Sequence, residues 1–219
     1  MSMNFFAQYT RPDLAYAVNA HARVMHNPGE AHQKSLKRLL RYTLGTHHLG
    51  LLYDFSSNNN DVNKGLYGFY DASHSSCPDT SRSTVGYVFY YDGCPISWSS
   101  RLHPYVTTST NHSEYVAGSQ CAKEASYLRN LSSELGLDVC PITLYSDSSG
   151  AIAQTYNPAN RKSTKHVDLA DHYIREQVEL RHIVVQYVDT KKMIADIFTK
   201  ALGRLLFSKF CCSLVGTIG

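Results

Sequence analysis

The sequence has no hydrophobic run approaching the ~20 residues that a membrane-spanning helix needs. Its six cysteines form no C-x-x-C pair and no zinc-type spacing, so we expect buried, reduced thiols. The first residues lack the basic stretch and the apolar stretch of a secretory signal. These absences argue against a membrane protein and against a disulfide-rich secreted protein, and they favour a cytosolic or nuclear location.

What the chain does have is the composition of a soluble globular protein. It contains 219 residues, of which 43% are hydrophobic and 18% are charged. That length can bury one core, or one core with a small subdomain. The net charge of +3 permits a polyanionic partner without requiring one, so the distribution of charge matters more than its sum.

The first 60 residues are predicted to form a small helical segment. One helix opens at Arg11-Pro12-Asp13 and ends at Asn27-Pro28-Gly29, and a second runs from about 30 to 44. The second helix carries basic residues at i, i+3, i+4 and i+7, namely Lys34, Lys37, Arg38 and Arg41. This stripe either lies along phosphates or is a solvated helix face. A polar linker over 56–61 marks the predicted boundary.

Residues 61–205 have the pattern of an α/β domain, and 206–219 are expected to be a C-terminal tail. Three antiparallel strands are predicted first, over about 66–70, 85–91 and 95–99. The tight turn Asp92-Gly93 joins the last two as a hairpin. The later elements are a helix over about 110–135, a strand over 142–145 that returns to the sheet in parallel, a helix after Asp147, a helix over about 166–179, a strand over 183–188 and a helix over 191–200.

Four acidic residues stand where such a fold would place a site. Asp71 follows the first strand, Glu114 opens the long helix, Asp147 follows the fourth strand and Asp196 lies on the last helix. Each has an ordinary structural explanation. Asp147 could cap the next helix, Glu114 could form a capping box with Asn111, Asp71 could be a turn residue, and Asp196 could be a solvated helix acid.

Taken together, the four acids point to a metal site. Carboxylates that converge repel one another and are driven toward protonation unless divalent cations neutralise them. Oxygen ligands favour Mg²⁺, with Mn²⁺ as a substitute, over zinc. Two such ions about 3.5–4 Å apart would suit the displacement of a phosphoryl group.

The order of the acids resembles that of ribonuclease H, and longer segments resemble the copia-type (Pseudoviridae) LTR-retrotransposon Pol polyprotein. In the α/β part these segments are Tyr70-Asp71-Ala72-Ser73, Ser81 to Phe89, Pro95 to Ser100, Ser113 to Ala117, Thr164 to Asp168 and Ala195 to Leu202. In the helical part they are Thr10 to Val18 and Leu39 to Thr46. Essentially the whole chain is covered.

The resemblance implies a ribonuclease H-like mixed five-stranded sheet, three strands antiparallel and two parallel, flanked by helices and preceded by a connection segment at 1–60. It implies cleavage of the RNA strand of an RNA/DNA hybrid during reverse transcription, with Asp71, Glu114, Asp147 and Asp196 as ligands of two Mg²⁺ ions. It further implies a polymerase domain of the same polyprotein as partner, and a place in a cytoplasmic virus-like particle or the nucleus. The chain has no Tyr-x-Asp-Asp polymerase motif, so we do not expect DNA synthesis.

Small polar side chains are suited to detecting 2′-hydroxyls across a shallow minor groove. The candidates for contact with the hybrid are Ser83, Thr84, Asn111, Ser148, Lys165 and His166. The lysines Lys162, Lys165, Lys191 and Lys192 either hold phosphates or are solvated loop charges.

Two departures from the family pattern stand out. The family usually has Asn after the third acid where this chain has Ser148. Cellular and retroviral relatives carry a histidine shortly before the fourth acid, where this chain has Val188-Asp189-Thr190. His166 or His172 could assist proton transfer instead, or could simply cap or pack a helix start.

Three rival interpretations remain at this stage. An integrase or resolvase shares the sheet topology, but the early three-stranded meander and Glu114 argue against that class. A domesticated or decayed fragment would keep the fold and bind nucleic acid without cutting it. A spacer within a larger polyprotein would have no chemistry of its own.

Overall fold

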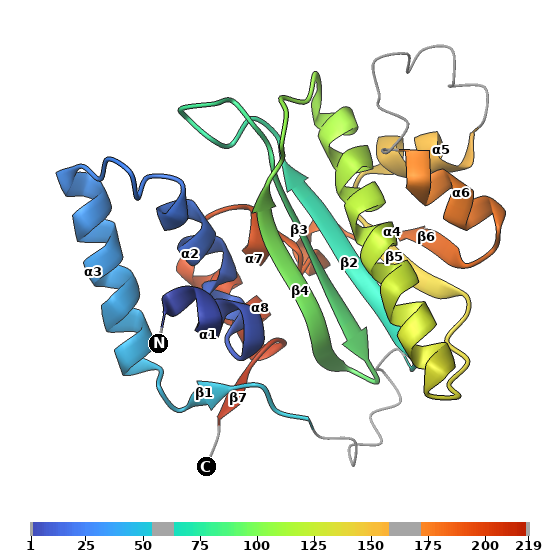
Figure 1. The fold of residues 1–219 in the computed structure, drawn as a ribbon, viewed down its shortest axis with the longest axis horizontal. Helices are drawn as coiled ribbons and strands as arrows, with labels where there is room; N and C mark the ends of the chain where they lie inside the picture. The colour runs from blue at the N-terminus through green and yellow to red at the C-terminus, as the bar shows by residue number, and fades with distance from the viewer. Residues whose placement is uncertain (1, 54–63, 158–171, 218–219) are drawn as a thin grey trace.

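The computed structural model describes residues 2–53, 64–157 and 172–217, and a five-stranded sheet lies at its centre (Figure 1). The strands of this sheet are β2 (Leu66–Ser73), β3 (Thr84–Tyr91), β4 (Cys94–Leu102), β5 (Ile142–Ser146) and β6 (Ile183–Tyr187). Their order is β4-β3-β2-β5-β6. The pairs β2–β3 and β3–β4 are antiparallel, whereas β2–β5 and β5–β6 are parallel. The predicted ribonuclease H-like fold class is confirmed by this order.

One face of the sheet is covered by three helices, α4 (Thr110–Glu134), α5 (Ser149–Tyr156) and α6 (Tyr173–Glu179). The long helix α4 lies close to β2 because its contact residues are small. A Cβ atom at Gly118 would lie 3.1 Å from the Tyr70 ring on β2 and 2.9 Å from Ile174 Cδ1 on α6. Because Gly118 has no side chain, α4 can pack closely against β2, the strand that carries Asp71.

The opposite face packs against α2 (Ala15–Ala22), α7 (Asp196–Thr199) and α8 (Arg204–Cys212). Residues expected to be a tail thus belong to a hydrophobic core, in which Phe210 and Leu214 are almost fully buried. The last strand, β7 (Gly216–Thr217), pairs antiparallel with β1 (Leu49–Gly50) of the N-terminal part. The end of the described N-terminal part is therefore paired through its backbone with the last described residues of the chain.

Strand β2 and the helix predicted over 191–200 differ from the prediction. Strand β2 continues past Tyr70 to Ser73, because Asp71 and the two residues after it stay paired with β3. The single helix predicted over 191–200 is wrong. A short 3-10 helix, η4 (Thr190–Lys192), ends at Met193, whose backbone is not helical and whose side chain is fully buried, and α7 begins only at Asp196.

The second predicted N-terminal helix is confirmed as α3 (Glu30–Gly45). The first is divided into the short helices η1 (Pro12–Leu14) and α2, and a further helix, α1 (Met3–Tyr9), precedes them. The predicted linker over 56–61 and the predicted boundary at 60 lie outside the described residues, as does the predicted start of the helix over 166–179. The division of the chain at residue 60 therefore stays a prediction.

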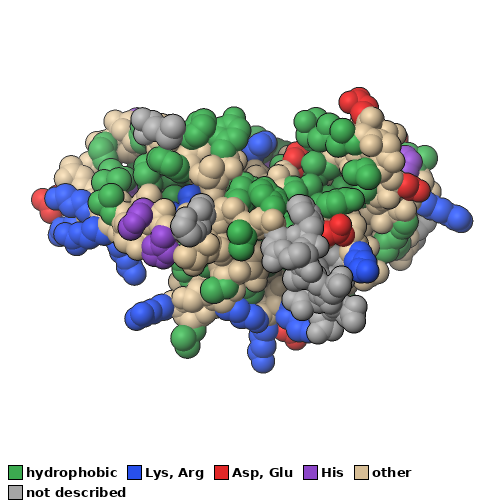
Figure 2. All heavy atoms as spheres, turned by 90° about the horizontal axis from the view of Figure 1, so that it is seen from below, with side chains coloured by type: hydrophobic (Ala, Val, Ile, Leu, Met, Phe, Trp, Pro, Cys, Tyr) green, Lys and Arg blue, Asp and Glu red, His purple; other side chains and the backbone are tan. Residues whose placement is uncertain are grey.

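The basic stripe of α3 lies on the molecular surface, where Figure 2 shows Lys and Arg side chains gathered at one end of the molecule. The apolar side of the same helix is also largely open. Leu39 is buried, but Leu36, Leu40 and Leu44 are 41%, 43% and 74% exposed. Among the described residues, α3 therefore buries only one of these four leucines.

The cysteines are all free thiols. Four of them are buried as expected, whereas Cys140 and Cys212 are exposed, so that prediction holds only in part. Among the described residues, no helix combines the length and the apolarity needed to cross a membrane.

A buried ion pair holds the N-terminal helices together. Arg11 donates to both carboxylate oxygens of Asp13 at 2.9 and 2.8 Å, and a third donor, Nη1, reaches the Thr46 carbonyl at the end of α3 at 2.8 Å. The Tyr42 hydroxyl also donates to Asp13, at 2.8 Å. Both charged side chains are almost fully buried, so either one alone would be left as an uncompensated charge.

We expect Arg11→Met to lower the free energy of unfolding by about 3–5 kcal/mol, because it strands the buried Asp13 carboxylate. Urea denaturation followed by circular dichroism measures the change. Lys34→Met, which removes one exposed charge from α3, is the matched control and should cost less than about 0.5 kcal/mol. A loss below about 1 kcal/mol for Arg11→Met would mean that the pair behaves like a surface salt bridge.

The position of α7 depends on a second glycine. A Cβ atom at Gly86 of β3 would lie 2.6 Å from Phe198 Cβ and 3.2 Å from the Phe198 carbonyl carbon. Backbone atoms cannot give way as a flexible side chain can. Even one added methyl group must therefore push α7, with Asp196 on it, away from the sheet.

We expect Gly86→Ala to destabilise the fold by about 1–3 kcal/mol through this overpacking. Gly45→Ala is the control, because nothing lies within 4 Å of the added methyl group at the end of α3. Thermal unfolding of both variants makes the comparison. Equal melting temperatures would show that α7 does not rest on Gly86.

Candidate active site

Three of the four predicted acids come together at one end of the sheet. Asp71 lies on β2, Glu114 on α4, and Asp147 directly after β5. Each offers a carboxylate oxygen, and these oxygens lie within 4.8 Å of one another. Asp71 and Glu114 are buried and Asp147 is half-buried. We refer to these residues as the three-carboxylate group.

Neither Asp147 nor Glu114 is a helix cap. Helix α5 is capped by Ser148, whose hydroxyl accepts the Ala151 N–H at 3.2 Å. Helix α4 is capped by Ser109 and starts at Thr110, so Glu114 lies beyond the position that a capping-box glutamate occupies. The capping explanations for both acids are therefore excluded by the observed helix starts.

Asp196 lies beside the three-carboxylate group and is tied to it by a lysine. It is the first residue of α7 and only 3% exposed, which excludes a solvated helix acid. The Lys200 ammonium lies 2.9 Å from Asp196 Oδ1 and 3.7 Å from Asp71 Oδ2. The Thr199 hydroxyl donates to the same Asp71 oxygen. Asp71 thus belongs to the three-carboxylate group and also contacts Lys200, which pairs with Asp196.

Sequence reasoning assigned no role to Lys200 or Thr199. A signal was present, since Asp196 and Lys200 are spaced i, i+4 and so face the same side of a helix. Such pairs are common on solvated helices, and only the burial of Asp196 distinguishes this one.

Burial and mutual repulsion raise the pKa values of two of these acids. The pKa of Glu114 rises from 4.5 to about 9, first because the side chain is buried and then because Asp71 and Asp147 are close. The pKa of Asp196 rises to about 6, again through burial and then through Asp71, and Lys200 opposes the rise. Burial alone would lower the pKa of Lys200, but the surrounding carboxylates raise it. A cation that approaches these acids therefore stabilises them, because it offsets the repulsion among the carboxylates.

A divalent cation suits this group of side chains. Glu114 Oε2 is buried and has no hydrogen-bond partner among the described residues. A buried carboxylate oxygen left unpaired is costly unless something else satisfies it. Because the group offers only oxygen ligands, hard divalent cations fit it.

Ser83 and Thr84, proposed from the sequence as substrate contacts, are fully buried. The Ser83 hydroxyl lies 2.7 Å from the Thr107 hydroxyl, and the Thr84 hydroxyl lies 2.6 Å from that of Ser76. The Ser83 contact joins the loop before β3 to the loop before α4, whereas the Thr84 contact joins the start of β3 to the loop after β2. Their hydroxyls are occupied by the protein itself.

Asn111 is exposed, and Ser148, which directly follows Asp147, is half-buried. The Asn111 amide donates to Gln154 Oε1 on α5 at 2.9 Å. Its carbonyl oxygen lies 2.5 Å from where a Cβ of Gly150 would be, so only glycine leaves room for it. These contacts fix the side chain across the gap between α4 and α5.

Other basic candidates are placed only in part. Lys162, Lys165 and His166 lie outside the described residues. His172 is described, and its Nδ1 lies 3.0 Å from the Tyr115 hydroxyl. Lys191 and Lys192 are exposed on η4.

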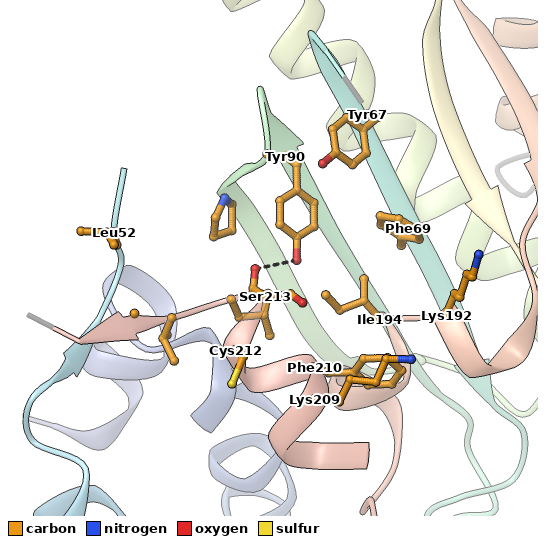
Figure 3. Close-up of a pocket in the computed structure, with 15 residues that line it drawn as sticks. Leu52, Tyr67, Phe69, Tyr90, Lys192, Ile194, Lys209, Phe210, Cys212 and Ser213 are labelled. Atoms are coloured by element: carbon orange, nitrogen blue, oxygen red, sulfur yellow. Dashed lines mark hydrogen bonds between the residues drawn. The ribbon is translucent and has the colours of Figure 1, made fainter. Parts of the chain in front are cut away.

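A pocket of about 500 Å³ lies on the other face of the sheet and contains none of the four acids (Figure 3). Its floor includes Tyr67 and Tyr90, whose rings stack at 5.4 Å, and Tyr90 donates to the Ser213 carbonyl at 3.3 Å. Lys192 and Lys209 lie at its border. It forms where α8 and the final residues pack on the sheet, away from the three-carboxylate group.

No protein-family model matches the chain. Among curated proteins, it is 36% identical over 207 residues to the retrovirus-related Pol polyprotein from transposon TNT 1-94 of Nicotiana tabacum, covering 94% of this chain and 15% of that protein. It is 35% identical over 214 residues to the Pol polyprotein from transposon RE1 of Arabidopsis thaliana, covering 97% of this chain and 14% of that protein. The chain thus spans about a seventh of the length of these relatives.

Among solved structures, ribonuclease H1 from Halobacterium salinarum NRC-1 is 16% identical with a TM-score of 0.40, over 61% of this chain and 93% of that one. At this level of similarity, the fold class rests on the strand order described above. Because the identity to the Pol polyproteins extends over nearly the whole sequence, the chain belongs to the family of copia-type retrovirus-related Pol polyproteins, of which it represents one segment.

Proposed function

We propose that this chain is a ribonuclease H, a metal-dependent endonuclease that hydrolyses the RNA strand of RNA/DNA hybrids during reverse transcription of a retrotransposon. The observation that carries the proposal is the convergence of Asp71, Glu114 and Asp147 within 4.8 Å, in a chain that matches a segment of Pol polyproteins. The fold does not need these three acids, because the burial of their carboxylates and the repulsion among them destabilise it.

The four acids are the proposed ligands, with the three-carboxylate group holding one ion and Asp71 with Asp196 holding another. When bound, Mg²⁺ or Mn²⁺ supplies activation of the attacking water and stabilisation of the leaving oxygen. Glu114 is drawn to its ionised form when positive charge arrives, because its pKa is raised only by burial and by neighbouring carboxylates. The protein thereby holds the ligands close together before ions and substrate arrive.

Asn111 and Ser148 are the proposed contacts to the hybrid's minor groove. The Asn111 amide nitrogen is held by Gln154, which leaves its carbonyl oxygen to accept a hydrogen bond from a 2′-hydroxyl. The Ser148 hydroxyl already caps α5, so it can donate to an acceptor of the hybrid. Ser83 and Thr84 would act indirectly, by holding the loops on this side of the sheet.

Lys165 and His166 complete the proposed substrate contacts, with roles at the phosphates and in proton transfer. The proposed partners are the hybrid and the polymerase domain of the same polyprotein. The proposed location is a cytoplasmic virus-like particle or the nucleus. These proposals are supported by the Pol polyprotein relatives, of which the chain matches 14–15%.

The direct test is cleavage of a labelled RNA/DNA hybrid in Mg²⁺, beside RNA duplex and DNA duplex substrates. We expect cutting of the hybrid alone. Asp147→Asn should reduce the rate about 100-fold or more, because even the partners of metal ligands contribute 10–100-fold. Glu134→Gln, an exposed acid at the far end of α4, is the matched control and should leave the rate unchanged.

Binding of the hybrid without cleavage by the wild-type chain would contradict the nuclease. That result would favour the alternative, a domesticated or decayed fragment that binds nucleic acid. If the wild-type chain neither bound nor cleaved the hybrid, the interpretation left would be a spacer within a larger polyprotein.

A pH dependence follows from Glu114. The folded protein keeps the Glu114 proton up to about pH 9, whereas the unfolded chain loses it near 4.5. Between these values the folded state binds more protons, so stability falls as pH rises. We expect the melting temperature in EDTA to fall over this window, with Mg²⁺ raising it most at the alkaline end.

The comparison with Glu114→Gln isolates this effect, because other groups titrate over the same range. Differential scanning calorimetry of both proteins from pH 5 to about 9 should show a flatter profile for the variant. Parallel profiles would mean that Glu114 is ionised in the metal-free fold.

A further inference from the structure

Lys200 lies where a second cation would have to bind. Its ammonium bridges Asp196 Oδ1 at 2.9 Å and Asp71 Oδ2 at 3.7 Å. Those two carboxylates are the ones assigned to the second ion, so the lysine and the ion need the same oxygens. The Thr199 hydroxyl donates to the same Asp71 oxygen, which adds a further donor to be displaced.

The surroundings of Lys200 allow the ammonium to leave. The Asp71 and Asp196 side chains are 3% and 4% exposed, but the Lys200 side chain is 40% exposed. The two acids are therefore fixed in the protein interior, whereas the lysine reaches them from the solvent side. A flexible four-carbon stem with a hydrated ammonium can move outward without opening the core.

We propose that Lys200 competes with a divalent ion for the oxygens of Asp71 and Asp196. Occupation of the site is then ordered. The three-carboxylate group, of which the lysine contacts only Asp71, takes an ion first, and the Asp71–Asp196 pair takes one only when Lys200 moves away. The lysine also keeps the fold stable before any ion binds, because it offsets the repulsion between two buried carboxylates.

This inference rests on the proposed function only in assigning divalent ions to the four acids. It concerns the order and strength of ion binding, which can be measured without nucleic acid. The probe is Mn²⁺ alone, followed by isothermal titration calorimetry and by electron paramagnetic resonance of the free ion.

The test compares the wild-type chain with Lys200→Met, which removes the charge at similar length. We expect the weaker of two Mn²⁺ ions to bind about tenfold more tightly to the variant, since a unit charge a few ångströms away acts through a partly solvated medium. Lys200→Arg keeps the charge and should bind Mn²⁺ like the wild type. Lys123→Met, which removes an exposed charge from α4, should also match the wild type.

A second readout is the melting temperature. In EDTA, Lys200→Met should melt below the wild type, and its gain on adding Mn²⁺ should be larger. If Lys200→Met does not fold without ions, Lys200→Gln takes its place, because the amide removes the charge and still donates a hydrogen bond to Asp196.

Unchanged Mn²⁺ affinity in Lys200→Met would overturn the proposal. Weaker binding that Lys200→Arg restores would overturn it too, and would make Lys200 a support that positions Asp196. Hybrid cleavage by the wild type together with either result leaves the proposed nuclease intact. If Lys200→Met binds Mn²⁺ more tightly but the wild type does not cleave the hybrid, the competition by Lys200 is supported and the proposed nuclease activity is contradicted.

Discussion

The repulsion among four carboxylates at one end of the sheet is the constraint on which the other features depend. Asp71, Glu114 and Asp147 arrive from β2, α4 and the end of β5, and Asp196 arrives from α7. Nothing in the packing of these elements requires acids at these points. The fold tolerates them through partial protonation, through Lys200 and through the Thr199 hydroxyl. A polar group that costs stability in this way is typical of a functional site.

The sheet and the site are joined through close backbone approaches. Gly118 lets α4 lie against Tyr70 on β2, and Gly86 lets Phe198 of α7 lie against β3. Gly118 lies on α4, which carries Glu114, and Gly86 contacts α7, which carries Asp196. The distance between the carboxylates thus depends on how closely these helices pack on the two faces of the sheet.

The sequence was most informative where the pattern is local. The strand alternation, the Asp92-Gly93 turn and the long apolar-faced helix predict elements that the structure contains within a few residues. The four acids stood out through their places relative to those elements and through the family resemblance. It was less informative where distant parts of the chain decide the outcome. Met193 interrupts a predicted helix, and its side chain is fully buried by parts of the chain that no local pattern reveals.

The same reason explains the hydroxyls and the lysine. Ser83 and Thr84 look like surface polar residues in the sequence, and only their partners Thr107 and Ser76 show that they are internal. Lys200 resembles any helix lysine until the burial of Asp196 is known.

The pairing of β1 with β7 helps to define which parts of the chain must be kept together in one fragment. Ala15 of α2 lies in the same core as Phe210 and Phe198, and the Trp98 indole of β4 donates to the Ala7 carbonyl of α1 at 2.7 Å. A cut at residue 60 would separate Ala15 from that core and Ala7 from the Trp98 indole. A fragment that keeps this packing, and with it resistance to proteolysis, therefore includes α1, α2 and β1 as well as the residues up to β7.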